Sequence, residues 1–364
     1  MSDRSFLLQL IFTLVLALLS AFLLTPPVKL LANRIGAIDV PKDNRRMHKV
    51  PIPRLGGLAI FLGFLISTLF FVQFDRQLMG ILLGALMIVI IGVIDDAKTL
   101  PALPKLLVQI AAAVIAVLHG NVIRFISNPN IFSDTQFIDI GWLSIPITII
   151  WIVAITNAVN FIDGLDGLAV GVSAISTASM LAIALLASEG QVALVLAALL
   201  GACVGFMPYN LNPAKIFMGD TGATFLGYIM ACLSIQGLFK FYAIISFAVP
   251  FLVLGIPIFD ICFAIIRRLA KGQNPMQADR GHVHHRLIDM GFNQKQSVAI
   301  TYMLTAVLGL SAVVLTASGE LKALVLIGAV LFVGGIGIGW IFKRQSNNEP
   351  RSDDRDLLSD NTPN

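Results

Sequence analysis

Asn157-Ala-Val-Asn160-Phe-Ile-Asp163-Gly-Leu-Asp166-Gly-Leu-Ala169 is a polar stretch with apolar runs on both sides. Its two carboxamides and two carboxylates follow one another at intervals of three residues, which is close to one helical turn. We therefore expect Asn157, Asn160 and Asp163 to share a helix face, and the two glycines that follow to weaken the helix. A plain polar turn would not need acids and amides at helical spacing, so the stretch indicates a binding site.

The composition is that of a polytopic membrane protein. Of the 364 residues, 57% are hydrophobic and 13% are charged, and the mean hydropathy is +0.87, which excludes a soluble domain. Cys203, Cys232 and Cys262 lie in apolar runs without CxxC spacing, which argues against a disulfide framework or a zinc site. The net charge of +4 is only mildly basic, and no nucleic-acid partner is expected.

Eleven apolar segments of membrane-spanning length predict an all-α polytopic membrane protein with about 11 transmembrane helices. With the N-terminus outside, twenty of the 25 Lys and Arg residues fall on inside segments, so the positive-inside rule predicts a cytoplasmic C-terminus. The expected spans are 6–26, 55–74, 78–94, 101–119, 142–160, 168–187, 190–209, 221–239, 242–266, 297–317 and 321–342.

These spans form one predicted transmembrane domain over residues 1–342, followed by a polar tail at 343–364 that we expect to be disordered. The outside connection 120–141 contains a partly alternating Phe137-Ile-Asp-Ile run, which suits a small hairpin. Nearly all the unusual chemistry falls on the inside connections, which are 27–54, 95–105, 157–168, 210–220 and 267–296.

Five aspartates collect at the cytoplasmic edge of the expected spans. Short carboxylates at helix ends, next to glycines, suit a hard divalent cation that also carries phosphate oxygens. Magnesium usually takes one or two protein groups and leaves its other positions to water and phosphate. For any one acid, a solvated helix end is the plain alternative. The five are Asp95, Asp96, Asp163, Asp166 and Asp220.

The connection 267–296 carries Asp279-Arg280-Gly281-His282-Val283-His284-His285-Arg286, so three of the five histidines lie within four residues. These side chains could bind a metal, or they could form a cationic clamp for phosphate or sugar hydroxyls. The absence of Cys and Glu nearby favours the clamp.

Two other inside positions are basic. The run Asn44–Gly57 contains arginines that suit either an anionic ligand or lipid headgroups. Lys105, at the entry to the fourth span, could snorkel to the headgroups or reach a lipid phosphate.

Five motifs together resemble the polyprenyl-phosphate N-acetylhexosamine-1-phosphate transferase family, in particular its undecaprenyl-phosphate GlcNAc-1-phosphate transferase branch. The resemblance runs from about Pro26 to about Trp340. The branch that transfers phospho-MurNAc-pentapeptide typically has consecutive histidines followed by an acid, whereas Arg286 follows here. The motifs are Pro53-Arg-Leu-Gly-Gly57, Ile94-Asp-Asp96, Asn157 to Ala169, Ala214 to Gly222, and His282-Val-His-His285.

The resemblance implies a reaction at the cytoplasmic face of the bacterial inner membrane. Undecaprenyl phosphate attacks the β-phosphorus of a UDP-N-acetylhexosamine, UMP leaves, and a lipid-linked sugar diphosphate starts a cell-envelope glycan such as lipopolysaccharide or teichoic acid. Mg²⁺ is the implied cofactor, with Mn²⁺ as a substitute, and a homodimer is compatible with the family.

The resemblance also assigns residues. The implied catalytic residues are Asp95, Asp96, Asp163, Asp220 and Lys105. The implied substrate-binding residues are Asn157, Asp166, Asn210, Arg280, His282, His284 and His285. Asn160 and Asp220 would contact the metal, and Asp260 matches the branch without an assigned role.

Direct attack is the expected mechanism, because a phosphate monoester with a second pKa near 6 is largely dianionic at neutral pH and hardly needs a base. Asp95 or Asp96 would orient the lipid phosphate or take its last proton, and a covalent aspartyl intermediate is the rival route. The alternative functions are the same chemistry with another UDP-amino sugar, a membrane transporter, and a non-catalytic lipid-binding scaffold.

Overall fold

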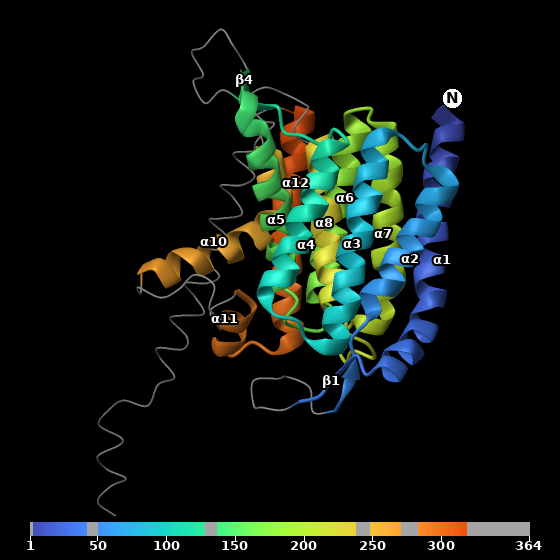
Figure 1. Ribbon diagram of the computed structural model, residues 1–364, viewed down its shortest axis with the longest axis vertical. Helices are drawn as coiled ribbons and strands as arrows, with labels where there is room; N and C mark the ends of the chain where they lie inside the picture. Colours follow the sequence, from blue (N-terminus) through green and yellow to red (C-terminus); the bar gives the residue numbers. More distant parts are fainter. Residues whose placement is uncertain (1–2, 42–49, 128–136, 238–247, 271–282, 319–364) are drawn as a thin grey trace, which may run out of the picture.

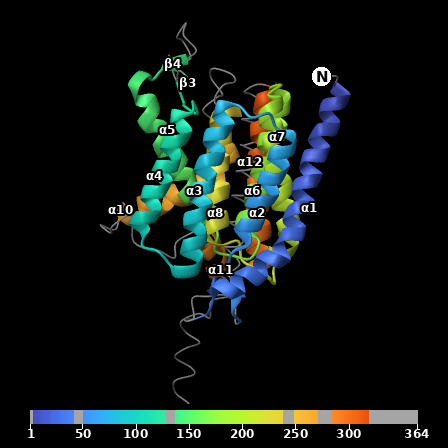
Figure 2. The same ribbon diagram turned by 45° about the vertical axis from the view of Figure 1, so that its right-hand side comes forward.

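The chain folds into a bundle of long helices that run side by side along the longest axis of the molecule (Figures 1 and 2). The structure, a computed structural model, describes residues 3–41, 50–127, 137–237, 248–270 and 283–318. Within these ranges six helices are long and apolar enough to cross a membrane, and two further apolar helices are shorter. The protein is therefore a multi-pass helical membrane protein, as its composition predicts.

The helices follow the apolar segments of the sequence closely. They are α1 (Asp3–Ile35), α2 (Gly56–Phe71), α3 (Arg76–Lys98), α4 (Ala102–Leu118), α5 (Ser144–Phe161), α6 (Leu168–Leu186), α7 (Gly190–Asn210), α8 (Gly219–Gly237), α9 (Ala248–Val253), α10 (Gly255–Ala270), α11 (Val283–Asp289) and α12 (Gln294–Ser318), with a short 3-10 turn η1 (Gly141–Leu143) before α5.

Two short antiparallel sheets lie outside the bundle. Strand β1 (Ile38–Asp39) pairs with β2 (Ile52–Pro53), in the connection between α1 and α2. Strand β3 (Phe125–Ser127) pairs with β4 (Phe137–Asp139), which confirms the hairpin predicted between residues 120 and 141.

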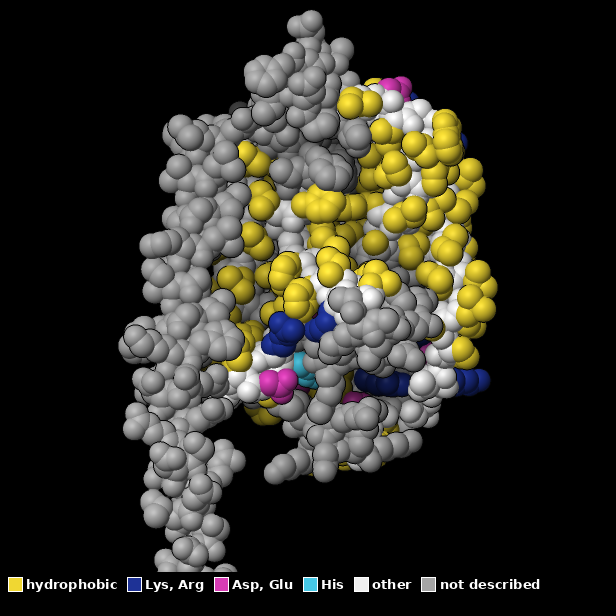
Figure 3. All heavy atoms as spheres, turned by 90° about the vertical axis from the view of Figure 1, so that its left-hand side faces the viewer, with side chains coloured by type: hydrophobic (Ala, Val, Ile, Leu, Met, Phe, Trp, Pro, Cys, Tyr) yellow, Lys and Arg dark blue, Asp and Glu magenta, His cyan; other side chains and the backbone are white. Residues whose placement is uncertain are grey.

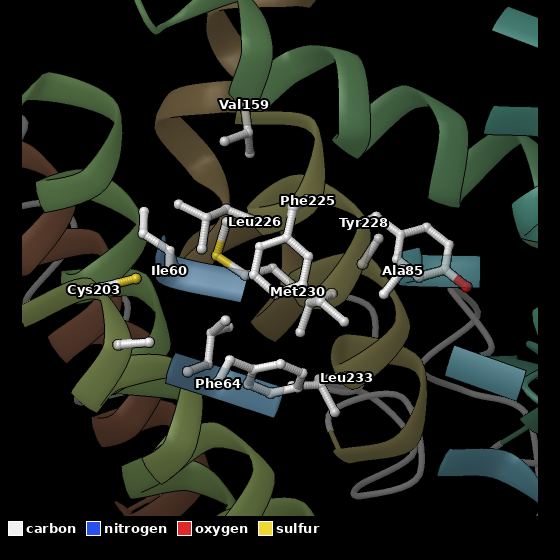
Figure 4. Packing of buried hydrophobic residues seen from close by; sticks show 14 of the residues in the cluster. Ile60, Phe64, Ala85, Val159, Cys203, Phe225, Leu226, Tyr228, Met230 and Leu233 are labelled. Atoms are coloured by element: carbon white, nitrogen blue, oxygen red, sulfur yellow. The ribbon is translucent and has the colours of Figure 1, made fainter. Parts of the chain in front are cut away.

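Helix α8 is the centre of the bundle. It packs against α2, α3, α5, α6 and α7, and every residue after its first two is buried. Figure 4 shows its Phe225 lying toward Phe64 of α2, and the centroids of the two rings are 5.5 Å apart. A residue at the start of α8 is therefore held by most of the bundle.

Two expected spans differ from the helices observed. Helix α1 continues through Pro26-Pro27 to Ile35, so the connection expected at 27–54 begins within a helix. The span expected at 242–266 is not one helix: within the described residues it is α9 and α10, which are separated at Leu254. Pro257 has no N–H to donate to Val253, which accounts for the break. The span at 321–342 and the tail at 343–364 lie outside the described residues.

The two ends of α3, α4 and α8 are joined by different chemistry. At one end the joining groups are neutral amides and one arginine. Gln236 of α8 donates to Asn121 (2.8 Å), Asn121 donates to the Gln77 carbonyl (3.0 Å), and Gln77 donates to the Gly120 carbonyl (3.0 Å). Arg76 donates to the Leu118 carbonyl (2.9 Å). At the other end, where α4 and α8 begin and α3 ends, the joining groups are charged, and they form the candidate site.

Candidate active site

The start of α8 is held against α2 by a close backbone contact. The Gly56 N–H donates to the Phe217 carbonyl at 2.9 Å. The Gly57 N–H donates to the Met218 carbonyl at 2.8 Å. A Cβ atom on Gly57 would lie 2.0 Å from the backbone nitrogen of Gly222, so only glycine fits. The Gly-Gly pair of the first motif thus fixes one edge of the site.

Asp96, at the end of α3, caps the first turn of α8. Its Oδ1 accepts from the Asp220 N–H (3.0 Å), and its Oδ2 accepts from the N–H (3.1 Å) and hydroxyl (2.6 Å) of Thr221. Its side chain is 1% exposed, and Arg54 Nε lies 4.0 Å from its Oδ1. A carboxylate at a helix N-terminus satisfies free N–H groups and suits the helix dipole. Asp96 therefore holds α8 in place.

Lys105, in the first turn of α4, joins two of the predicted catalytic acids. Its Nζ lies 2.9 Å from Oδ2 of Asp95 and 2.9 Å from Oδ2 of Asp220. Asp95 is further fixed by the Leu100 N–H, which donates to its Oδ1 at 2.6 Å. The side chain of Asp220 is 33% exposed, so it remains accessible to a ligand from the pocket.

Asp166 lies in the turn between α5 and α6 and holds the loop before α8. Its Oδ2 accepts from the Asn212 side chain (3.0 Å) and from the Ala214 N–H (3.0 Å). Asn212 must present its amide nitrogen to this carboxylate, because a carboxylate only accepts. The same nitrogen donates to Oε1 of Gln294 at 3.0 Å, which ties the start of α12 to this loop.

Asn210, the last residue of α7, is buried and uses both ends of its carboxamide. Its Oδ1 accepts from the Gly167 N–H (3.2 Å), and its Nδ2 donates to the Ile216 carbonyl (3.0 Å). Gly167 has a φ of +78°, which suits glycine at the start of α6. Asn210, predicted to bind substrate, thus braces the α5–α6 turn against the loop before α8.

These segments enclose a pocket of about 310 Å³. Its wall is strongly acidic, and Arg54 is the Lys or Arg side chain that faces it within the described ranges. Figure 3 shows Lys and Arg, acidic and His side chains gathered below the hydrophobic surface of this face. The lining residues are Asp39, Arg54, Asp96, Asp163, Gly164, Leu165, Asp166, Asn210, Phe217, Gly219, Asp220, His285 and Gln294.

Asp163 is the acid that the fold leaves available. Helix α5 ends at Phe161, so Asp163 lies in the turn beyond it and not on the helix face expected from the spacing. No described residue forms a hydrogen bond with its carboxylate. Burial, and then the charges of Asp220, Asp96 and Asp166, raise the pKa of Asp163 from 3.8 to about 8.

A divalent cation fits this arrangement. It would offset the repulsion among Asp163, Asp220 and Asp96, all of which line the pocket. Among the described residues, no three His, Cys, Asp or Glu side chains converge on a complete metal site. Magnesium does not require one, because it usually takes one or two carboxylates together with water and substrate phosphate.

The remaining predicted residues are placed as follows. Asn157 donates to Gln109 of α4 (2.6 Å) and does not line the pocket, and neither does Asn160. His285 lines it from α11. Val283, His284 and His285 begin that helix, whereas Arg280 and His282 lie outside the described residues.

Apart from Asn210, two lining residues lie outside the predicted motifs. Asp39 precedes the first basic run, and only its pairing in β1 brings it to the pocket. Gln294 had no motif around it, but its Nε2 is buried without a hydrogen-bond partner in the described part of the chain. That donor is available to a ligand acceptor. Gln294 comes close to Asp166 only through folding, and no local pattern in the sequence predicts this proximity.

Known proteins resemble this chain over most of its length. Residues 78–238 match the family described as "Glycosyl transferase family 4". A Bacillus subtilis protein named "Probable undecaprenyl-phosphate N-acetylglucosaminyl 1-phosphate transferase" is 40% identical over 312 residues, covering 85% of this chain and 86% of the relative. "Decaprenyl-phosphate N-acetylglucosaminephosphotransferase" of Mycobacterium tuberculosis is 32% identical over 348 residues, covering 87% and 85%.

A second group of relatives carries another name. "Phospho-N-acetylmuramoyl-pentapeptide-transferase" of Halalkalibacterium halodurans is 34% identical over 250 residues, which cover 65% of this chain and 76% of the relative.

Proposed function

The chain belongs to glycosyl transferase family 4, and on that premise we propose that it transfers GlcNAc 1-phosphate from UDP-GlcNAc to undecaprenyl phosphate, releasing UMP. The observation that carries the proposal is the convergence of Asp96, Asp163 and Asp220, from three separate segments, on one pocket beside His285 and Arg54. The names of the relatives with the widest coverage support GlcNAc as the sugar.

The proposed reaction is a direct displacement at phosphorus. An oxygen of the lipid phosphate forms a bond to the β-phosphorus of UDP-GlcNAc, the bond to the bridging oxygen breaks, and UMP leaves with that oxygen. Asp95 and Asp96 already bind Lys105 and the start of α8, so neither is well placed to act as a covalent nucleophile. This supports attack by the lipid phosphate itself.

Anionic reactants in an acidic pocket require added positive charge. Asp220 and Asp163 would hold Mg²⁺, with Mn²⁺ as a substitute, and the ion would supply charge neutralisation to the diphosphate. Lys105 fixes the position of Asp220, and Arg54 and His285 present donors to the phosphates. Asn160 would join the ion only if the end of α5 turned toward the pocket.

We further propose eleven spans, with the N-terminus outside and the C-terminus in the cytoplasm, so that the pocket faces the cytoplasm. The excess of Lys and Arg on the connections at the pocket end supports this orientation. In a bacterial inner membrane, that face gives access to nucleotide sugars, and the lipid product would start a cell-envelope glycan.

The main alternative function is the same reaction with phospho-MurNAc-pentapeptide as the transferred group, which is the group named in the second set of relatives. The purified protein, supplied with undecaprenyl phosphate and Mg²⁺, would be offered UDP-GlcNAc and UDP-MurNAc-pentapeptide separately while UMP release is followed. Release from UDP-GlcNAc that requires both lipid and Mg²⁺ is the expected result. Release from the pentapeptide donor alone would overturn the choice of sugar, and release from neither would overturn the reaction.

The route is tested in the same preparation. Without lipid, labelled UMP should not exchange into UDP-GlcNAc, because direct displacement has no enzyme-bound intermediate. Exchange would establish the covalent route.

A further inference from the structure

Asp260 is a carboxylate within an otherwise apolar part of α10, and the proposed reaction does not use it. The residues before it, Gly255-Ile-Pro-Ile-Phe259, and the six that follow are uncharged. Asp260 does not line the pocket, and it is 1% exposed. A buried carboxylate is costly unless it is hydrogen-bonded, so its contacts indicate its role.

The Asp260 contact reaches the histidine segment. Its Oδ1 accepts a hydrogen bond of 2.7 Å from the backbone N–H of Val283, which is the first residue of α11. The first N–H groups of a helix have no partner within the helix, so this bond satisfies one of them. Two residues further along α11, His285 lines the pocket.

A second contact between the same helices is in register with the first. The guanidinium of Arg286 lies over the ring of Phe263, 4.5 Å from its centroid. Phe263 is three residues after Asp260, and Arg286 is three residues after Val283. Residues three apart lie on one face of a helix, so α10 and α11 face each other through two adjacent contacts.

We propose that Asp260 is a positioning residue that docks α11 on α10 and so sets His285 in the pocket, with Phe263 as the second anchor. This inference rests on the proposed function, because it assigns His285 to the donor substrate. Helix α11 has only seven residues, from Val283 to Asp289, and is too short to keep a fixed orientation by itself.

The test compares variants of the full-length protein in the UMP-release assay. Asp260→Ala removes the acceptor, and we expect kcat/KM for UDP-GlcNAc to fall about tenfold. Asp260→Asn keeps the Oδ1 acceptor and should retain most of the activity. Asp289→Ala makes the same change on the exposed side of α11 and should leave kcat/KM unchanged.

A double-mutant cycle with His285→Ala separates positioning from general damage. If Asp260 acts through His285, Asp260→Ala should have little further effect in a protein that already lacks the imidazole. Equal fold-losses in both backgrounds would overturn the proposal.

Hydrogen exchange provides a readout that does not depend on activity. In Asp260→Ala, amides of residues 283–290 should exchange faster while those of α8 do not change. Unchanged exchange at 283–290 would overturn the proposal. If the wild-type protein releases no UMP, the proposed function fails, yet the exchange measurement still decides whether Asp260 docks α11.

Phe263→Leu is the second variant, for use if Asp260→Ala does not fold. It removes the ring under Arg286 and should speed exchange over 283–290. Phe70→Leu makes the same substitution at a 76%-exposed position of α2 and should not. Equal exchange in both leucine variants would count against a docked α11.

Discussion

Replacing Asp96 with alanine should destabilise the protein as well as inactivate it, because Asp96 caps α8. Two backbone N–H groups, those of Asp220 and Thr221, would lose their acceptor, together with the Thr221 hydroxyl. A buried N–H without a partner costs about 1–3 kcal/mol, and pocket water would offset part of the loss. We expect a decrease of about 3 kcal/mol in the free energy of unfolding, or roughly 4 °C in Tm for a chain of this length.

The cysteines of the chain provide the assay. Cys203 and Cys232 are buried and react with a fluorogenic thiol dye only after unfolding, whereas Cys262 is exposed and should first be changed to serine. Asp96→Asn keeps one acceptor oxygen and should lose about half as much stability. Asp220→Asn leaves the cap intact and serves as the control. An unchanged Tm in Asp96→Ala, measured at the same heating rate, would refute the capping argument.

Three further outcomes are expected. Asp220→Asn should lower UMP release at least about 100-fold, because the carboxylate of Asp220 faces the pocket and Lys105. The Tm of this variant should stay within about 2 °C of wild type. Near-normal turnover would mean that Asp220 does not act on the diphosphate. Gly57→Ala should prevent normal folding of the helix bundle, since its Cβ would lie 2.0 Å from the Gly222 nitrogen. The control Gly190→Ala meets only the Phe6 ring at 3.2 Å and should be tolerated. The two variants would be compared by size-exclusion chromatography, and a monodisperse Gly57→Ala protein would contradict the contact. The pKa of Asp163 rises from 3.8 to about 8 in the folded protein, which therefore binds this proton more tightly than the unfolded chain does. The stability contributed by protonated Asp163 is thus present below pH 4 and is lost as pH rises to about 8. In EDTA at pH 8.5, the Asp163→Asn variant should therefore unfold at a higher temperature than wild type, and at pH 5 the difference should be much smaller. Unfolding would be followed by tryptophan fluorescence. No difference at pH 8.5 would mean that the pKa of Asp163 is not raised in the folded protein.

The sequence predicts where the helices lie better than where they bend. Apolar length is a local property, so α2 to α8 begin and end close to the expected positions. Prolines are ambiguous locally: Pro26 and Pro27 are accommodated within α1, whereas Pro257 coincides with the break between α9 and α10. Which of these happens depends on the packing around each proline, which a single sequence does not contain.

The same limit applies to the site. The acids were predicted as a group, and Asp96, Asp163, Asp166 and Asp220 do line one pocket. The role of each side chain in the site depends on hydrogen-bond partners that are far away in the sequence. Asn210 binds Gly167, which is 43 residues away, and no local pattern announces that pairing.

The two ends of α3, α4 and α8 should respond differently to solution conditions. Amides of Gln77, Asn121 and Gln236 carry no charge, so their mutual bonds are insensitive to acid and to ionic strength between ordinary laboratory extremes. The opposite end gathers carboxylates that repel one another when they are ionised, and a bound cation would offset this repulsion. Removing the cation at alkaline pH should therefore loosen the pocket while the amide-joined end still holds the three helices together, so activity should disappear reversibly before the bundle unfolds, and return when the cation is restored.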